Sequence, residues 1–171
     1  MLIGAAIIPI IIALAIAIPK ISPSGDQAPA TSASLVRIEF IKEDIKRVSY
    51  GVTERAGALK SEALTIDGKG RAFYDVRVEG EKGSQTRFQV SSQDMKRLNA
   101  LITDTGFMQI PKSDFAVKDD ASEFTRYTLN VNLGNQAKMV QWADESASKD
   151  FVPPLLTRIS DTLTEIVKNN L

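Results

Sequence analysis

The sequence contains no cysteine and no histidine, and these two absences exclude several kinds of chemistry. Without cysteine there is no disulfide, no thiolate nucleophile and no haem attachment through a thioether. Without histidine there is no imidazole base, and without either residue there is no Cys/His site for zinc or copper. Only carboxylate, hydroxyl, amine and backbone groups remain to carry a reaction or to hold an ion.

An excess of one charge is also absent, because the 171 residues include 21 Lys and Arg against 21 Asp and Glu. No block of five or more like charges occurs along the chain. Such a sequence lacks the basic footprint that drives binding to a phosphate backbone. We therefore expect no nucleic-acid partner.

Residues 2–18 form an uncharged apolar run of Ile, Ala and Leu, interrupted by Gly4 and Pro9. Seventeen residues rise roughly 25 Å as a helix, which is the short end of what crosses a hydrocarbon core of about 30 Å. Pro9 frees the carbonyl of Ala5, and in lipid that carbonyl favours a neighbouring helix. We expect residues 1–18 to be a transmembrane anchor that contacts membrane lipid.

Two other interpretations of residues 2–18 compete with an uncleaved anchor. A cleavable signal peptide fits the apolar character, but no Lys or Arg precedes the run, and the small-residue site at residues 28–30 lies far downstream with a proline inside. A buried core helix fits the length, but such a helix would not normally lead into a Pro- and Ser-rich segment.

Residues 19–34 are rich in proline and serine, which is typical of a polar, semi-extended tether. Charge hardly determines the orientation, because Lys20 is opposed only by the N-terminal amine. Tethers of this kind are commonest on exported domains. We therefore expect a single-pass protein of the cell membrane whose soluble domain, residues 35–171, is extracytoplasmic.

From residue 35 onward the hydrophobic period changes to that of strands. Alternation over residues 36–40 and again over residues 48–52 predicts two early strands, although Leu35, Ile38, Ile41, Ile45 and Val48 also fit one face of a helix. Residues 64–66 and 73–78 flank Asp67-Gly68-Lys69-Gly70, and the Asp-Gly pair is expected to supply the positive φ of a hairpin turn. The other interpretation of these glycines, a phosphate-binding loop, is weak because a third glycine is missing and a strand follows.

Helices follow two of the later strands. A strand at residues 86–90 leads to a serine cap at residues 91–92, an apolar stripe over residues 95–102 and Gly106 as the expected C-cap. A hairpin pairs residues 127–133 with residues 140–142 across Gly134-Asn135. The last helix begins at Pro153-Pro154 and is expected to share one apolar face, formed by Leu155, Ile159, Leu163 and Ile166.

These elements predict the α+β class. We expect an antiparallel sheet of about five to six strands with two amphipathic helices on one face, preceded by one transmembrane helix. The order of elements from residue 48 to residue 142, with a capped helix ending in Gly106-Phe107, an acidic loop and Tyr127-Thr128-Leu129 entering a hairpin, resembles uncharacterised small α+β domains of exported or membrane-anchored bacterial and archaeal proteins. The resemblance implies fold and location but no activity, and a cysteine-bearing turn found in some such domains has no counterpart here.

Three constellations are candidates for chemistry or binding. Ser146 and Lys149 have the S-x-x-K spacing in which a lysine activates a serine, but their polar loop context favours a solvated lysine. Asp119, Asp120 and Glu123 could ligate calcium, although the loop lacks the pattern of a recognised calcium loop. Trp142 could anchor an interface, but a lone Trp on an alternating strand is more often core.

The sequence therefore predicts no catalytic, cofactor-binding or metal-binding residue. The leading hypothesis is a membrane-anchored, non-catalytic module, an accessory or structural subunit that packs on an integral membrane protein complex. A ligand- or ion-sensing extracytoplasmic domain that uses the acidic loop at residues 114–123 is the alternative, and a cell-envelope hydrolase is the second alternative.

Overall fold

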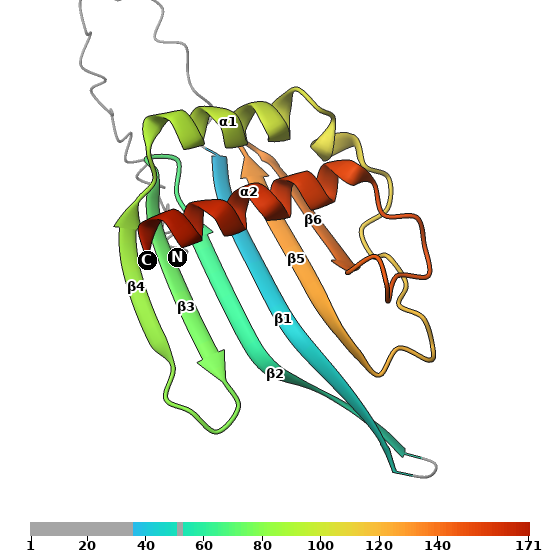
Figure 1. The fold of residues 1–171 in the computed structure, drawn as a ribbon. Coiled ribbons are helices and arrows are strands. Elements are labelled where there is room, and N and C mark those ends of the chain that lie inside the picture. The colour runs from blue at the N-terminus through green and yellow to red at the C-terminus, as the bar shows by residue number, and fades with distance from the viewer. Residues whose placement is uncertain (1–35, 51–52) are drawn as a thin grey trace, which may run out of the picture. The chain divides into compact units, whose positions relative to one another are not determined.

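The structure is a computed structural model that describes residues 36–50 and 53–171 (Figure 1). The expected anchor at residues 1–18 and the tether at residues 19–34 lie outside these residues. Within the described part, no helix is both long enough and apolar enough to cross a membrane.

The described residues form six strands, two α-helices and one 3-10 helical turn, η1. Their bounds are β1 (Val36–Tyr50), β2 (Thr53–Ile66), β3 (Arg71–Val78), β4 (Ser84–Gln89), α1 (Ser92–Thr103), η1 (Phe107–Gln109), β5 (Glu123–Leu133), β6 (Gln136–Ala143) and α2 (Pro154–Asn170). The predicted α+β class, the strand number and the two helices are confirmed.

The strands make one antiparallel sheet in the order β4-β3-β2-β1-β5-β6. The first four strands follow one another as a meander, and β5 returns after α1 to pair with the free edge of β1. The first strand therefore lies inside the sheet, where Phe40 is opposite Leu64 on one side and Leu129 on the other.

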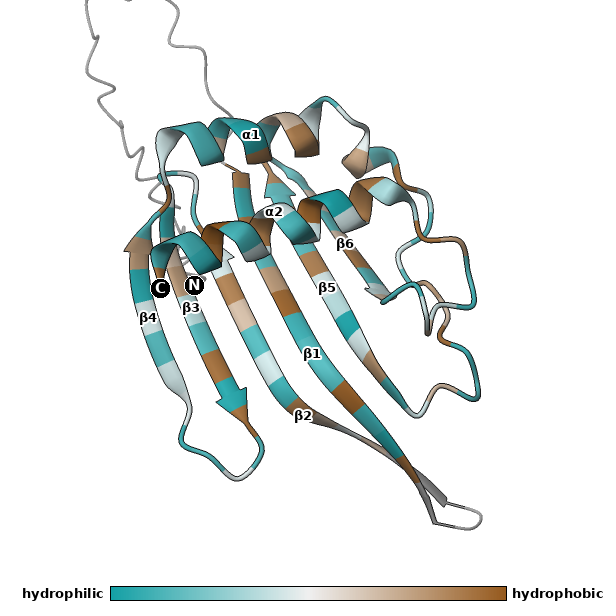
Figure 2. Ribbon diagram, in the orientation of Figure 1, coloured by the Kyte–Doolittle hydropathy of each residue, from teal (hydrophilic) through white to brown (hydrophobic). Residues whose placement is uncertain are grey.

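Both helices cover the same face of this sheet (Figure 1). Hydrophobic and hydrophilic residues alternate along most strands (Figure 2), so these strands turn apolar residues toward the helices. The core lies between the two layers and includes fully buried residues from both: Ile38, Leu64, Ile66, Leu98, Ile102, Phe107, Leu129, Leu156, Ile159 and Leu163. In α2 the buried residue of the first turn is Leu156, whereas Leu155 is only partly buried.

Local sequence signals place the helix ends. The side chain of Ser91 accepts a hydrogen bond from the backbone N–H of Asp94 at 3.1 Å, so the predicted serine cap of α1 is confirmed. The predicted C-cap is wrong, because α1 ends with Asp104 as its cap. Gly106, with φ 83°, lies two residues farther on and begins η1.

Two expectations about the early strands are also corrected. Residues 36–50 form one continuous strand and not two, because β1 pairs with β5 from Val36 and with β2 from Ile38 to Tyr50, with a single register shift between Asp44 and Ile45. In the β2–β3 turn the positive φ belongs to Gly70, at 78°, and not to Gly68. The predicted β5–β6 hairpin is confirmed, with Gly134 at φ 59°.

A second, smaller hydrophobic cluster lies on the face of the sheet opposite the helices. Trp142 and Ala143 are consecutive residues of β6 and are both almost fully buried, at 2% and 1% exposure. Neighbours along a strand point to opposite faces, so both faces are covered at this end of β6. The small cluster consists of Ile45, Phe124, Ala143 and Ala147, with Val117 and Ala121 packed against it.

Candidate functional site

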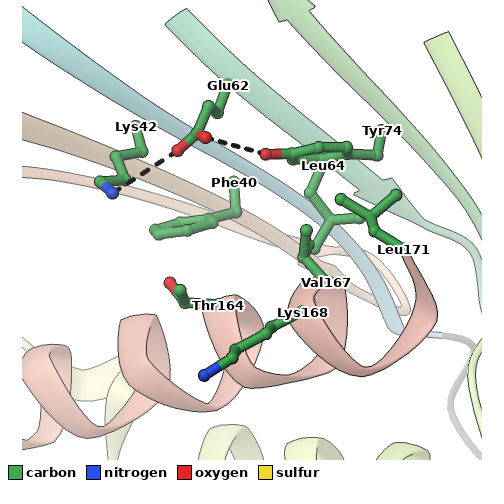
Figure 3. Close-up of a pocket in the computed structure, with 9 residues that line it drawn as sticks. All are labelled: Phe40, Lys42, Glu62, Leu64, Tyr74, Thr164, Val167, Lys168 and Leu171. Atoms are coloured by element: carbon green, nitrogen blue, oxygen red, sulfur yellow. Dashed lines mark hydrogen bonds and ion pairs between the residues drawn. The ribbon is translucent and has the colours of Figure 1, made fainter.

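The helix-facing side of the sheet changes from apolar to charged within one step of the strand alternation. Phe40 and Leu64 are register partners in the core, and the next pair on the same face is Lys42 and Glu62. An open pocket of about 240 Å³ lies between this part of the sheet and the C-terminal half of α2 (Figure 3). We call it the α2 pocket.

Glu62 is the most heavily bonded side chain of the α2 pocket. Its Oε1 accepts hydrogen bonds from Lys60 Nζ at 2.6 Å and from the Tyr74 hydroxyl at 2.9 Å. Its Oε2 lies 3.5 Å from Lys42 Nζ. The side chain of Glu62 is only 19% exposed, so these partners compensate for water that its carboxylate has lost.

The same contacts set the ionisation of the two acids. Burial raises the pKa of Glu62. The hydrogen bonds from Lys60 and Tyr74 and the charge of Lys42 lower it by more than burial raises it, so the pKa lies below its ordinary value. Burial, together with the hydrogen bond to Glu62 and its charge, raises the pKa of Tyr74 well above the ordinary value for a tyrosine. Near neutral pH the pair is a carboxylate and a neutral phenol. It is therefore suited to fixing structure and charge and does not supply a general acid or base.

The two ends of the α2 pocket differ in polarity. In Figure 3 the ammonium groups of Lys42 and Lys168 lie toward one end, near Thr164, and the side chains of Val167 and Leu171 lie toward the other. One lysine comes from the sheet and the other from the last turn of the helix. Such a pocket can bind a molecule with an apolar body and an anionic end.

A second hollow, of about 640 Å³, lies beside the N-terminal half of α2. Tyr127 and Trp142 line it from the sheet, and their rings stack on each other with centroids 5.4 Å apart. Tyr127 is the register partner of Lys42, so the two pockets are lined from adjacent positions on neighbouring strands, on the same face of the sheet. The second hollow is acidic, because its charged lining residues are Asp144, Glu145, Asp150, Asp161 and Arg158.

Two of these carboxylates hold the surrounding loops together. Asp144 accepts hydrogen bonds from the backbone N–H of Thr125 at 2.7 Å, Ser146 at 3.1 Å and Ala147 at 3.2 Å. Asp150 accepts from Lys112 Nζ and from the backbone N–H of Ala116, each at 2.6 Å. These bonds give both residues a structural role.

The S-x-x-K pair does not form a nucleophile and base. The hydroxyl of Ser146 donates a hydrogen bond to Asp144, while Lys149 Nζ lies 3.5 Å from Asp119, with which it forms an ion pair. The segment is a turn without helical geometry, so the spacing of three residues does not place the lysine beside the serine.

The acidic loop does not gather its carboxylates. Asp119 is turned to solvent with its side chain 95% exposed, and Glu123 forms an ion pair with Lys46 at 2.6 Å. Among the residues that the structure describes, no group of three or more acidic side chains lies close enough to hold a metal ion.

The remaining two candidates have structural roles. Trp142 is 2% exposed and packs in the main core, as the more frequent interpretation predicted. In the Gly68 to Gly70 turn, the backbone amides that could bind phosphate are already used: Asp67 accepts from the N–H of Lys69 at 2.9 Å, of Gly70 at 2.8 Å and of Arg71 at 3.0 Å.

Sequence reasoning missed the α2 pocket entirely. The available signal was that the charged residues Lys42 and Glu62 stand where the alternation of apolar residues along β1 and β2 would continue. Only the strand register shows that these two side chains lie opposite each other.

Comparisons with models of known protein families and with curated proteins gave no match.

Proposed function

We propose that this protein is a membrane-anchored, non-catalytic module, an accessory or structural subunit that packs on an integral membrane protein complex. Residues 2–18 serve as the anchor and residues 19–34 as the tether, and the domain at residues 35–171 lies outside the cytoplasm. The part of the domain that reaches the partner is the end of the β1–β2 hairpin.

One observation carries the docking role of this hairpin. β5 pairs with β1 only as far as Lys46, and β3 pairs with β2 only from Lys60 onward. The N–H of Arg47 still donates to the carbonyl of Ser122, and the carbonyl of Leu59 still accepts from the N–H of Glu79. Beyond these two residues β1 and β2 pair with each other alone, and they extend past the rest of the sheet (Figure 1). A two-stranded ribbon is only marginally stable by itself in water, so a partner surface would stabilise this one.

The composition of the ribbon also supports protein contact. Residues 56–59 of β2 are Ala, Gly, Ala and Leu, which are exposed and carry no charge. Leu59 is 41% exposed and has no register partner in β1, because Asp44 pairs with Lys60 and Ile45 pairs with Ala58. This uncharged, partly apolar stretch at one side of the ribbon is suited to burial against another protein.

The test is gentle detergent extraction of the full chain from its native membrane, followed by sizing. We expect the chain to migrate in a complex larger than a monomer. A variant in which Asn-Gly replaces residues 48–55 should migrate as a monomer, since a two-residue turn can close the ribbon at the register pair Arg47 and Ala56.

A pair of point variants separates contact from folding. Leu59→Asp should release the chain from the complex, whereas Met139→Asp should not, although Met139 is even more exposed at 55%. A monomeric wild-type chain in the native extract, or equal behaviour of the two variants, would contradict the proposal.

A ligand-sensing role is the second candidate, and the α2 pocket favours it. The support comes from that pocket and not from the acidic loop, whose carboxylates point apart. The hydrolase alternative gains no support from Ser146, because its hydroxyl is bonded to Asp144.

A further inference from the structure

We propose that the α2 pocket binds a single-chain amphipathic carboxylate of about eight carbons. This inference deepens the ligand-sensing candidate and is independent of the docking of the β1–β2 ribbon. It is carried by the size of the pocket, by the separation of its polar and apolar ends, and by two lysines with unused hydrogen-bond donors.

The size of the pocket sets the size of the ligand. A cavity of about 150 Å³ holds benzene, which has six non-hydrogen atoms. In proportion, the 240 Å³ of the α2 pocket accommodates about ten non-hydrogen atoms. Octanoate has this number, with eight carbons and two oxygens.

The walls match the two parts of such a molecule. Phe40, Leu64, Val167 and Leu171 supply apolar surface for the alkyl chain. The carboxylate end lies at Lys42 and Lys168, beside Thr164 (Figure 3). Lys168 belongs to the last turn of α2, where its positive charge offsets the partial negative charge of the helix C-terminus.

The side-chain charges at the polar end favour an anion. Lys42 and Lys168 line the pocket with two positive charges. Glu62 brings one negative charge, which Tyr74 and Lys60, a residue outside the lining, already engage through hydrogen bonds. The ammonium group of Lys42 lies within ion-pair range of Glu62 but donates no hydrogen bond to any residue the structure describes. Lys168 forms no ion pair within the described ranges. A carboxylate between these two ammonium groups would satisfy donors that the domain leaves open.

The experiment is calorimetric titration of the full chain in lipid nanodiscs, with empty nanodiscs as the blank for partition into the bilayer. We expect saturable binding of octanoate at one site. From butanoate to octanoate the dissociation constant should fall about fourfold for each added methylene, and it should stop falling beyond eight to ten carbons. Octylammonium should not bind, because it places a cation between two cations.

Variants then assign the binding to the α2 pocket. Lys42→Gln and Lys168→Gln should each weaken octanoate binding at least about threefold, and the double variant at least about tenfold. Lys96→Gln, which removes an exposed charge on α1 away from the pocket, is the matched control and should bind as the wild type does. Lys42→Arg keeps the charge and should keep most of the affinity, which separates lost binding from a folding defect.

Several results would overturn the inference. These are no saturable binding of octanoate at millimolar concentration, equal binding of octylammonium, an affinity that does not depend on chain length, or a double lysine variant that binds as well as Lys96→Gln does. None of these results bears on the complex formed through the ribbon, so the two proposals fail separately.

Discussion

Tyr74 of β3 donates a hydrogen bond from its hydroxyl to the carboxylate of Glu62 on β2, at 2.9 Å, on the face of the sheet that carries the helices. The two residues are not direct register partners, because Tyr74 is opposite Leu64 and Glu62 is opposite Val76. The long phenol side chain reaches diagonally across one step of the ladder. This diagonal bond closes the apolar core at Leu64 and begins the charged part of the same face.

Replacing Glu62 with Gln should destabilise the domain most near neutral pH. The folded-state pKa of Glu62 is below its ordinary value, so its ionisation stabilises the fold above the unfolded-state pKa, and that contribution is lost as the pH falls through the folded-state value. We expect a loss of about 1–3 kcal/mol in the free energy of unfolding at neutral pH, which shrinks toward zero in acid. Urea unfolding across the acid range measures it.

Glu123→Gln is the control for this pH dependence. Glu123 also has a lowered pKa, caused by the hydrogen bond and the charge of Lys46, but its side chain is 64% exposed. A surface ion pair contributes little, so this variant should unfold much as the wild type does at every pH. If Glu62→Gln lost the same free energy in acid as at neutral pH, the charge of Glu62 would not be the cause.

Replacing Asp144 with Ala should loosen the segment between β6 and α2. The backbone N–H groups of Thr125 and Ser146 would lose their acceptor together, whereas that of Ala147 keeps the backbone carbonyl of residue 144, at 3.1 Å. We expect a loss of about 2–4 kcal/mol and faster amide hydrogen exchange at Thr125 and Ser146. The neighbouring exposed residue gives a control, since Glu145→Ala should alter neither. Unchanged exchange at Thr125 in the Asp144 variant would contradict this role.

Replacing Gly70 with Ala should destabilise the β2–β3 hairpin. Gly70 has φ 78°, and a Cβ atom there would lie 2.8 Å from Gln89 Nε2 and 3.2 Å from the carbonyl oxygen of Val90. Both the left-handed backbone and the contacts oppose a side chain, so we expect a loss of about 1–3 kcal/mol. Thermal or urea unfolding measures it.

Gly57→Ala is the matched control for the glycine argument. A Cβ atom at Gly57 would meet nothing within 4 Å, and its φ is not positive. Alanine also restricts the unfolded chain, so this variant should be neutral or more stable by up to about 1 kcal/mol. Equal destabilisation by the two substitutions would show that backbone geometry at Gly70 is not the reason.

The sequence by itself determined the features that depend on neighbours along the chain. The two-residue alternation identified the inward rows of most strands, and Ser91 and Pro154 placed the starts of both helices. Local signals were insufficient where the same residues are compatible with two backbone conformations of a turn. The Asp-Gly pair suggested a positive φ at Gly68, but the hydrogen bonds that Asp67 accepts place it at Gly70.

Only the tertiary structure decided what lies together on the sheet. Lys42, Glu62, Tyr74 and Lys168 come from three strands and a helix, and they form one pocket because the register sets them side by side. The unpaired length of the β1–β2 ribbon likewise depends on where β3 and β5 stop pairing. Pairing between distant strands is chosen by the packing of whole faces, and no local pattern in the sequence contains that information.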